Sequence, residues 1–456
     1  MNRSSDPDLI NLHGIRFPRA WLYQHTLVTG MTGCGKTHGV LKPLIRQLLA
    51  ANNHSPELRP ALVVFDIKGD LKSIIESALA QCGRTSDLIT VGVGAGEATF
   101  NPFADASLTA TQIVQQLMAS ASLASQEASQ RNPPEELFWA MARQDLLTAL
   151  VELTQTALRD SGVQLSLQHL QRTRALLSQP DLVLKKWISD VTNVLSEASA
   201  VALKEWARLP DNTRASVTSS VGTVLAPWAR EPLSRLVNPD DQRPLLDLQE
   251  VVQAGKVVVI NAAQTEHAEA LWPACLLLKQ ALFKLALTRS RLAVNQERMV
   301  AIIIDEANRL ISPHNHLSSE HVALESARSN RFAIILAAQN LSGLNAINGD
   351  VLTDKLAALC GNQIFLANSC PATLRLAQRC FGDHIVWRRH KTVVPTLPAP
   401  QLFPGGASDN GAGSQFTLVP VEVPRISAAT LARLPTGAAR AKLVDGSIHQ
   451  FQCSFD

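Results

Sequence analysis

The chain has 456 residues, of which 46% are apolar and 18% are charged, and its formal net charge is +3. At roughly 100 to 200 residues per domain, this length predicts two or three domains with cores large enough to fold without disulfides or metals. The composition excludes a disordered chain, a collagen-like repeat and a small disulfide scaffold. No stretch reaches the roughly eighteen apolar residues that span a bilayer, and no apolar signal segment follows the first residues. The sequence therefore predicts a cytoplasmic protein.

The cysteines and histidines form no complete metal-binding template. The seven cysteines contain no C-x-x-C pair, and their odd number prevents full internal pairing, which predicts reduced thiols. His314, His316 and His321 form an H-x-H arrangement followed by a third histidine. No carboxylate or cysteine completes a ligand set beside them, so a polar surface loop is favoured over a metal site.

Five short apolar runs that end in polar residues predict the strands of a buried parallel sheet. The runs are rich in valine and isoleucine and do not alternate with polar residues, which is typical of strands buried on both faces. They cover residues 26–28, 61–65, 257–260, 300–304 and 333–338. Helical patterns lie between them, for example at 40–50 and 271–287. Strands that alternate with helices predict an α/β fold.

A long segment inside this α/β pattern predicts helices alone. Helical patterns at 107–122, 134–159, 165–177 and 182–208 are separated by polar breaks that contain proline. We therefore expect an α/β domain with a mainly parallel sheet, formed by residues 1–103 and 246–456. An all-α inserted domain, residues 104–245, is expected to interrupt it. Residues 395–413 are rich in proline and glycine and predict a flexible surface loop.

The strongest functional signal follows the run at 26–28. It is a complete G-x-x-x-x-G-K-[ST] motif with an apolar run before it and a helical pattern after it. The motif consists of Gly30, Met31, Thr32, Gly33, Cys34, Gly35, Lys36 and Thr37. Its glycines allow backbone N–H groups to surround phosphates at the N-terminus of a helix. We expect Lys36 to reach the β- and γ-phosphates of ATP and Thr37 to bind Mg²⁺.

A second signal is an apolar run that ends in two carboxylates, Asp305 and Glu306. In a chain with a phosphate-binding loop, this pattern favours a Walker B element over a strand that simply meets solvent. We expect Asp305 to hold Mg²⁺ through water and Glu306 to act as the general base that polarises the attacking water. The predicted enzyme is a P-loop ATPase that uses ATP and Mg²⁺.

Three further polar features each have two interpretations. Gln339, at the end of the run at 333–338, is either a γ-phosphate sensor or a strand-capping amide. Arg328, ahead of the same run, is either an arginine finger for a neighbouring subunit or a solvated arginine. Lys68 and Asp70 follow the run at 61–65, at the strand end where α/β folds bind ligands. They contact nucleotide or a neighbouring subunit, or they form a local salt-bridged turn.

The densest basic cluster lies near the C-terminus. It consists of Trp387, Arg388, Arg389, His390 and Lys391. Such a cluster either binds a phosphate backbone, with Trp387 available for stacking, or forms a solvated charged face. Because the net charge is only +3, any affinity for DNA has to come from local surfaces such as Arg388, Arg389 and Lys391.

The order of these motifs resembles that of the TraG/TraD-type coupling ATPases of conjugation and type IV secretion, which are relatives of the HerA and FtsK motor ATPases. The matching segments are 25–37, 66–70, 101–103, 305–307, 328–339 and 361–363, with smaller similarities at 213–216 and 434–437. These segments follow the order of the family and cover most of the chain.

This resemblance implies a RecA-like nucleotide-binding domain that assembles as a homohexamer. The motor is expected to deliver DNA or a nucleoprotein substrate to a conjugation or type IV secretion channel, with relaxase or secretion-channel proteins as partners. Arg328 would be the trans-acting finger and Gln339 the sensor. Family members commonly carry N-terminal transmembrane helices, whereas this chain begins almost directly at its first strand. We therefore expect recruitment to the inner membrane from the cytoplasm through a separate partner.

Two alternatives stay open at this point. One is a soluble HerA/FtsK-like DNA translocase that acts in DNA processing or defence. The other is an adaptor in which ATP assembles a ring that docks substrate proteins through the helical domain. The presence of Glu306 argues against the adaptor, because a pure nucleotide switch does not need a general base.

Overall fold

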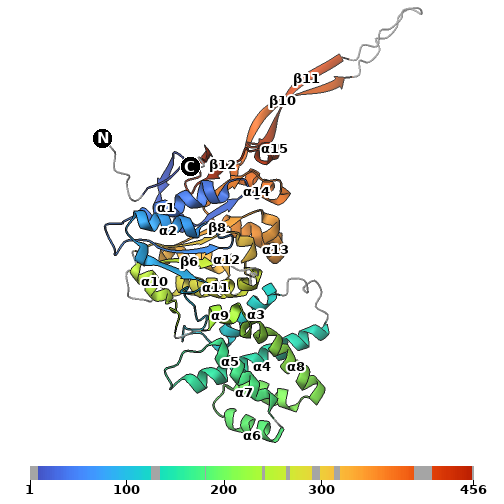
Figure 1. Cartoon of the computed structure of the whole chain (residues 1–456). Helices are drawn as coiled ribbons and strands as arrows, with labels where there is room; N and C mark the ends of the chain where they lie inside the picture. Colours follow the sequence, from blue (N-terminus) through green and yellow to red (C-terminus); the bar gives the residue numbers. More distant parts are fainter. Residues whose placement is uncertain are drawn as a thin grey trace, which may run out of the picture.

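The computed structural model describes residues 9–124, 134–179, 181–238, 242–262, 268–289, 298–312, 319–394 and 413–453. Within these residues, one sheet of nine strands forms the centre of the molecule (Figure 1). In chain order its strands are β3 (Thr26–Thr29), β4 (Ala61–Asp66), β5 (Leu88–Val91), β6 (Val257–Asn261), β7 (Val300–Ile304), β8 (Phe332–Ala338), β9 (Asn362–Leu366), β12 (Ala438–Lys442) and β13 (Ile448–Gln452). Their order across the sheet is β13-β12-β9-β3-β8-β7-β4-β6-β5. The strands from β9 to β5 pair in parallel, and β12 and β13 add an antiparallel edge.

Helices cover both faces of this sheet. One face carries α1 (Lys42–Ala50), α2 (Lys72–Gln81) and the short hairpin β1 (Leu9–Leu12) and β2 (Ile15–Pro18). The other face carries α11 (Trp272–Thr288), α12 (Glu320–Ser326), α13 (Leu341–Ala358) and α14 (Pro371–Phe381). The five apolar runs of the sequence form β3, β4, β6, β7 and β8, and each of these strands is buried along its whole length. The prediction of an α/β fold with a mainly parallel sheet is confirmed.

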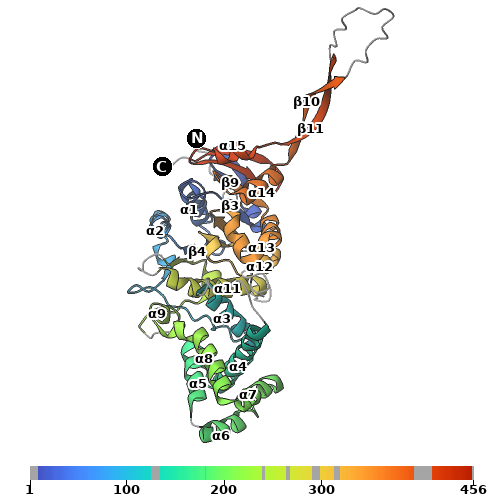
Figure 2. The ribbon, with the colours of Figure 1, turned by 90° about the vertical axis from the view of Figure 1, so that its right-hand side faces the viewer.

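A helical lobe lies at one end of the molecule (Figures 1 and 2). It consists of α3 (Ala110–Ala124), α4 (Pro134–Leu158), α5 (Leu167–Ala175), α6 (Asp181–Val191), α7 (Glu197–Arg208), α8 (Asp211–Leu225) and α9 (Leu233–Val237). The described residues between 104 and 245 contain no strand, apart from one isolated bridge between Thr99 and Leu245. The helical character of this segment agrees with the sequence, and the domain boundaries stay a prediction. After the lobe, α10 (Leu248–Ala254) leads into β6.

The expected continuous helix at 182–208 is wrong, because the chain breaks between α6 and α7. Ser196 starts α7 as its N-cap, and its hydroxyl oxygen accepts a hydrogen bond from the Ser199 backbone N–H. Glu152 of α4 holds the same turn, since its carboxylate accepts from the Ser196 hydroxyl at 2.7 Å and the Ser199 hydroxyl at 2.6 Å. A serine N-cap satisfies a backbone N–H that is free at the start of a helix, so Ser196 favours a new helix at this point.

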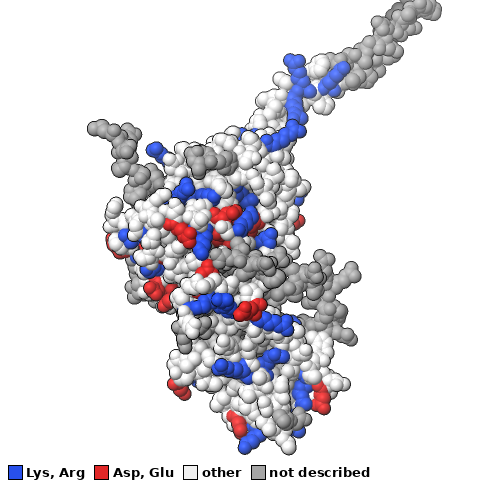
Figure 3. Space-filling model, viewed as in Figure 1, with Lys and Arg blue, Asp and Glu red and all other residues white. Residues whose placement is uncertain are grey.

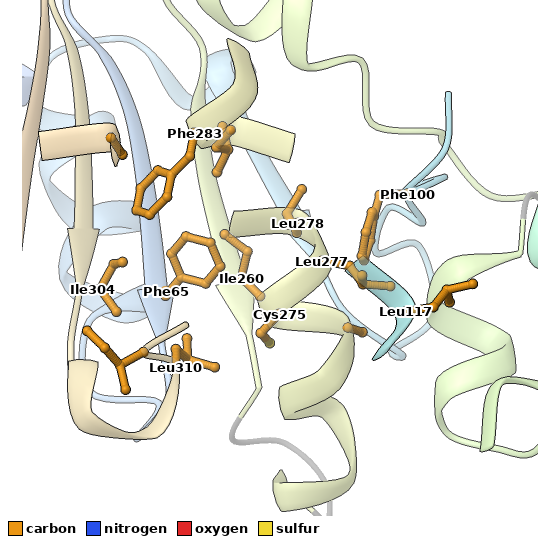
Figure 4. Close-up of a cluster of buried hydrophobic side chains, with 14 of the residues drawn as sticks. Phe65, Phe100, Leu117, Ile260, Cys275, Leu277, Leu278, Phe283, Ile304 and Leu310 are labelled. Carbon is orange, nitrogen blue, oxygen red and sulfur yellow. The ribbon is translucent and has the colours of Figure 1, made fainter. Parts of the chain in front are cut away.

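One apolar core joins the sheet to the helical lobe. Phe65 and Ile304 on the sheet pack with Phe283 of α11, and Leu277 of the same helix lies toward Leu117 of α3 (Figure 4). All five side chains are almost completely buried. Because α11 is covered by the sheet on one side and by α3 on the other, it is buried on nearly all sides, which explains its almost unbroken apolar sequence.

A two-stranded hairpin projects from the body at the end opposite the helical lobe (Figures 1 and 2). It consists of β10 (Asp383–Val394) and β11 (Gly413–Pro424), which pair in antiparallel register. Of the surface loop expected at 395–413, residues 395–412 lie outside the described residues. After the hairpin, α15 (Ala428–Ala432) leads back to β12. The basic cluster of the sequence therefore lies on β10, in a position that the sequence did not predict.

The three histidines do not share one surface loop. His314 and His316 lie outside the described residues. His321 is buried on α12, where its Nε2 lies 2.8 Å from the carbonyl oxygen of Leu352 in α13. The expectation of a polar surface loop is therefore wrong for His321, which lies on one helix and contacts the backbone of a second.

Among the residues that the structure describes, none of the helices combines the length and the apolar character that a membrane span needs.

A buried histidine fixes the start of the strand that carries the phosphate-binding loop. His25 is 1% exposed, and its Nδ1 accepts a hydrogen bond from the Ile334 N–H at 3.1 Å. Its Nε2 therefore carries the proton and donates to the Leu324 carbonyl oxygen at 3.0 Å. Burial lowers the pKa of His25 from 6.5 to about 4, so the imidazole is neutral in the folded protein.

This lowered pKa predicts that stability falls in mild acid. Between pH 6.5 and 4 the unfolded chain binds a proton at His25 that the folded chain does not, so the free energy of unfolding decreases as pH falls. From pH 7.5 to 5.5 the wild-type protein should lose about 1.4 kcal/mol more than a His25→Gln variant. Urea unfolding of both proteins at the two pH values measures this difference. Equal losses in the two proteins would show that His25 is not the responsible group.

Candidate nucleotide-binding site

Four polar loops meet at one edge of the sheet because four neighbouring strands run in parallel. β3 pairs with β8, β8 with β7, and β7 with β4. The phosphate-binding loop follows β3, the turn from Asp66 to Lys72 follows β4, Asp305 and Glu306 follow β7, and Gln339 follows β8. The carboxyl edge of a parallel sheet is the usual place of ligand binding in α/β proteins.

The phosphate-binding loop adopts backbone angles that require glycine. Gly33 and Gly35 have φ angles of 77° and 100°, which side chains other than glycine rarely adopt. At Gly30, a Cβ atom would lie 2.5 Å from the Cys34 sulfur. A π-helical turn, Thr37–Leu41, then leads into α1. The loop is therefore folded as a phosphate-binding loop, with its glycines at the positions that its turns require.

Two neighbouring segments support the phosphate-binding loop through its backbone. The Met31 N–H donates to the Ala367 carbonyl oxygen beyond β9 at 2.9 Å. The Gly437 N–H, just before β12, donates to the Cys34 carbonyl oxygen, also at 2.9 Å. Gly437 belongs to the 434–437 segment that resembles the coupling ATPases, and these contacts give that segment a structural role next to the nucleotide loop.

Lys36 is folded back onto its own loop. Its side chain is buried, and the ammonium donates to the carbonyl oxygen of Gly30 and, at 3.3 Å, to that of Met31. Burial lowers the pKa of Lys36, although the carboxylates of Asp305 and Glu306 oppose this shift. To contact a phosphate, the ammonium would have to exchange these carbonyl oxygens for phosphate oxygens.

Asp305 has an oxygen that fits a metal ion. The carboxylate is fully buried, and its Oδ1 accepts from the Glu306 backbone N–H at 3.0 Å. Oδ2 is buried without a hydrogen-bond partner in the described part of the chain, and burial raises the pKa of Asp305 to about 6. A buried, unpartnered carboxylate oxygen is costly unless a ligand satisfies it, and oxygen is the ligand that Mg²⁺ prefers.

Glu306 has a partner on each carboxylate oxygen. Gln339 Nε2 donates to Oε2 at 2.7 Å, and the Lys68 ammonium forms an ion pair with Oε1. The residue is 1% exposed and has a left-handed backbone with φ 56° and ψ 47°. A non-glycine residue with this backbone is strained, and such strain is concentrated at functional sites. Two residues that the sequence predicts for the site, Gln339 and Glu306, are thus in direct contact.

The turn after β4 aims Lys68 at Glu306. The buried carboxylate of Asp66 accepts hydrogen bonds from four backbone N–H groups, at 2.8 to 3.1 Å. The donors are Gly69, Asp70, Leu71 and Lys72. Gly69 has a φ of 82°, so the turn also requires a glycine. The sequence left Lys68 with two interpretations, and it missed the Glu306 contact because the contact depends on β4 lying beside β7.

Arg328 and the basic cluster are not part of this edge. Arg328 is exposed in a short 3-10 turn, Ala327–Asn330, that precedes β8. It therefore lies at the amino edge of the sheet, a strand length of roughly 20 Å from the carboxyl edge where Glu306 lies. Arg388, Arg389 and Lys391 are exposed on the projecting hairpin.

The mainly parallel sheet, the phosphate-binding loop after β3 and the carboxylate pair after β7 together define a RecA-like P-loop NTPase. The comparison with protein families gives the particular branch. The chain belongs to the family of type IV secretion-system coupling protein DNA-binding domains, whose pattern matches residues 9–396. The resemblance inferred from motif order is confirmed. A comparison with curated protein sequences finds no significant match.

Solved structures of a coupling protein and of VirB4 have the same fold. The unbound monoclinic form of the bacterial conjugative coupling protein TrwBdeltaN70 is 19% identical, with a TM-score of 0.66, over 100% of this chain and 90% of that chain. Plasmid coupling protein TrwB in complex with ADP and Mg²⁺ is 18% identical, with a TM-score of 0.64, over 100% and 90%. VirB4 of Thermoanaerobacter pseudethanolicus is 11% identical, with a TM-score of 0.52, over 94% and 89%.

Proposed function

We propose that this protein is an ATP-hydrolysing motor that moves DNA or a nucleoprotein substrate toward a conjugation or type IV secretion channel. The observation that carries the proposal is the meeting of Lys36, Asp305 and Glu306 at one sheet edge in a coupling-protein family member. The similar coupling protein TrwB has been solved with ADP and Mg²⁺, which supports the same ligands for this chain. Neither alternative from the sequence has an observation of this kind in its favour.

Each residue of the edge has a chemical task in this proposal. Lys36 contacts the β- and γ-phosphates, and the backbone N–H groups of the phosphate-binding loop surround them. Thr37 and Asp305 hold Mg²⁺, which supplies positive charge to the phosphates when it is bound. Glu306 accepts a proton from the attacking water, and Gln339 orients the Glu306 carboxylate through its hydrogen bond.

The first test measures ATP hydrolysis with and without DNA. We expect DNA to stimulate the wild-type rate, and we expect Glu306→Gln to lower it by at least about 100-fold, because the amide cannot accept the proton of water. Lys36→Ala should also abolish hydrolysis. Glu325→Gln is the matched control, since Glu325 is an exposed carboxylate paired with Lys355 far from the edge. Hydrolysis that Glu306→Gln leaves unchanged would contradict the assigned mechanism.

A ring follows from the position of Arg328 in this proposal. The guanidinium is exposed at the amino edge of the sheet, so it lies too far from its own nucleotide site to contact a phosphate. An arginine in that position serves hydrolysis only in a neighbouring subunit. We therefore propose a homohexamer in which Arg328 stabilises negative charge at the neighbour's site, as trans-acting arginine fingers do.

Mixing two inactive variants tests the shared site. Arg328→Ala alone should lower hydrolysis by at least about 100-fold, given the large contribution of arginine fingers. Mixing it with Lys36→Ala should restore part of the rate, because some interfaces then combine an intact Arg328 with an intact Lys36. Arg331→Ala, an exposed arginine three positions further along, is the matched control. Wild-type turnover in Arg328→Ala would exclude the finger.

We also propose that the hairpin of β10 and β11 contacts DNA. Alternation along β10 places Trp387, Arg389 and Lys391 on one face, and Lys391 lies opposite Phe416 of β11. The side chains of Trp387 and Phe416 are 63% and 62% exposed, and basic residues follow the hairpin (Figure 3). Exposed aromatic and basic side chains on one face can stack on bases and neutralise phosphates.

Charge reversal tests the hairpin. The Arg389→Glu/Lys391→Glu protein should bind DNA more weakly, and the slope of log affinity against log salt should fall by about two. The control is Lys186→Glu/Lys204→Glu, because these two exposed lysines lie on the helical lobe and give the same change in net charge. Fluorescence anisotropy over a salt series measures both slopes. Equal effects of the two double substitutions would show that only bulk charge matters.

The remaining partners stay predictions. A relaxase and secretion-channel proteins fit a coupling role, and the cytoplasmic location with recruitment to the inner membrane follows from the same role. Co-purification with a relaxase of the same genetic element would support the coupling proposal over a DNA-processing role.

A further inference from the structure

One charged side chain of the site has no task in the mechanism above. Lys68 forms an ion pair with Glu306, and its side chain is 33% exposed while that of Glu306 is 1% exposed. Burial alone would lower the pKa of Lys68, but the contact with Glu306 outweighs it and raises the pKa. The ammonium is therefore a stable cation placed directly on the proposed general base.

The ion pair conflicts with the task of Glu306. A general base needs a free carboxylate oxygen that can accept a proton from water. In the structure Gln339 occupies one oxygen and Lys68 the other. Before Glu306 can accept a proton from water, it therefore has to lose one of these two partners.

The order of the strands shows what can remove Lys68 from Glu306. Across the sheet β3 is followed by β8, β7 and β4, so Glu306 lies between the phosphate-binding loop and the turn that carries Lys68. A nucleotide whose α- and β-phosphates lie in that loop directs its γ-phosphate toward Asp305 and Glu306. The γ-phosphate therefore brings a strong anion next to Glu306, the residue that Lys68 contacts. ADP brings no such group.

We propose that Lys68 is a positioning residue that responds to the γ-phosphate. With the γ-phosphate position empty, Lys68 pairs with Glu306; with a nucleoside triphosphate bound, Lys68 pairs with the γ-phosphate and leaves Glu306 free to act on water. The turn built on Asp66 holds the backbone fixed, so the exchange needs only a rotation of the lysine side chain. This inference rests on the proposed ATPase function and adds the group that distinguishes ATP from ADP.

The test compares the binding of two nucleotides to the full chain in the presence of Mg²⁺. For Lys68→Met, the dissociation constant for a non-hydrolysable ATP analogue should rise about tenfold, because one charge-assisted contact to phosphate is lost. The dissociation constant for ADP should stay within about twofold of wild type. Lys68→Arg should restore most of the affinity for the analogue, since the guanidinium keeps the charge and the reach.

The matched control is Lys72→Met. Lys72 belongs to the same turn, its side chain is 25% exposed, and it pairs with Glu97 instead of Glu306. This variant should bind both nucleotides as the wild type does. Calorimetric titration gives the affinities, and thermal unfolding of each variant checks that the protein is folded.

Each other result has a defined meaning. If Lys68→Met loses equal affinity for ADP and for the analogue, the inference is overturned. Lys68 would then support the structure of the loop without contacting the γ-phosphate. Unchanged binding of both nucleotides would also overturn it, because Lys68 would then not reach the γ-phosphate. If the wild type hydrolyses ATP but shows either result, only this inference fails. If the wild type binds neither nucleotide, the proposed function fails together with it.

Discussion

The parallel pairing of β3, β8, β7 and β4 is the constraint on which the rest of the structure depends. These strands are buried on both faces, so polar side chains can be accommodated only where the strands end. Because all four run in the same direction, their carboxyl ends form one edge, and every ionisable group of the candidate site comes from a loop at that edge. The fold itself therefore brings the ionisable groups of the candidate site together.

Charge balance explains how four charged groups can lie close together at this edge. Lys36 and Lys68 offset Asp305 and Glu306, so neither sign is in excess. A triphosphate changes this balance, because its negative charge has to be matched by Mg²⁺ and by lysines released from their present partners. The loop after Glu306 is supported by the buried Lys279–Glu320 pair: Lys279 donates to the Leu310 carbonyl oxygen, and Glu320 accepts from the Ser312 N–H. Among the contacts described at this edge, those of the lysines are the ones that a ligand can exchange.

Much of the fold could be predicted because its signals are local. Most of the strands buried on both faces are continuous apolar runs, so the runs at 61–65 and 300–304 were sufficient to predict β4 and β7. The missed strands lack this signal: β9 begins with Asn362 and Gln363, whose polarity hides a buried strand, and β10 and β11 are exposed on both faces. The phosphate-binding loop was predictable because its residues are consecutive. The Lys68–Glu306 pair was not, because it depends on which strands are neighbours.

The path of the chain after β9 links the two surfaces that the proposed motor has to couple. From the hairpin, the chain passes through only one short helix, α15, before it reaches Gly437, whose N–H supports the phosphate-binding loop at Cys34. A force on β11 can therefore reach the backbone of the nucleotide loop through the short segment 425–436. The helical lobe lies at the other end of the molecule (Figure 2) and is joined to the sheet through α3 and α11 instead. If the hairpin binds DNA, the shortest structural connection between the DNA and the ATP site runs through the C-terminal strands, and not through the helical lobe.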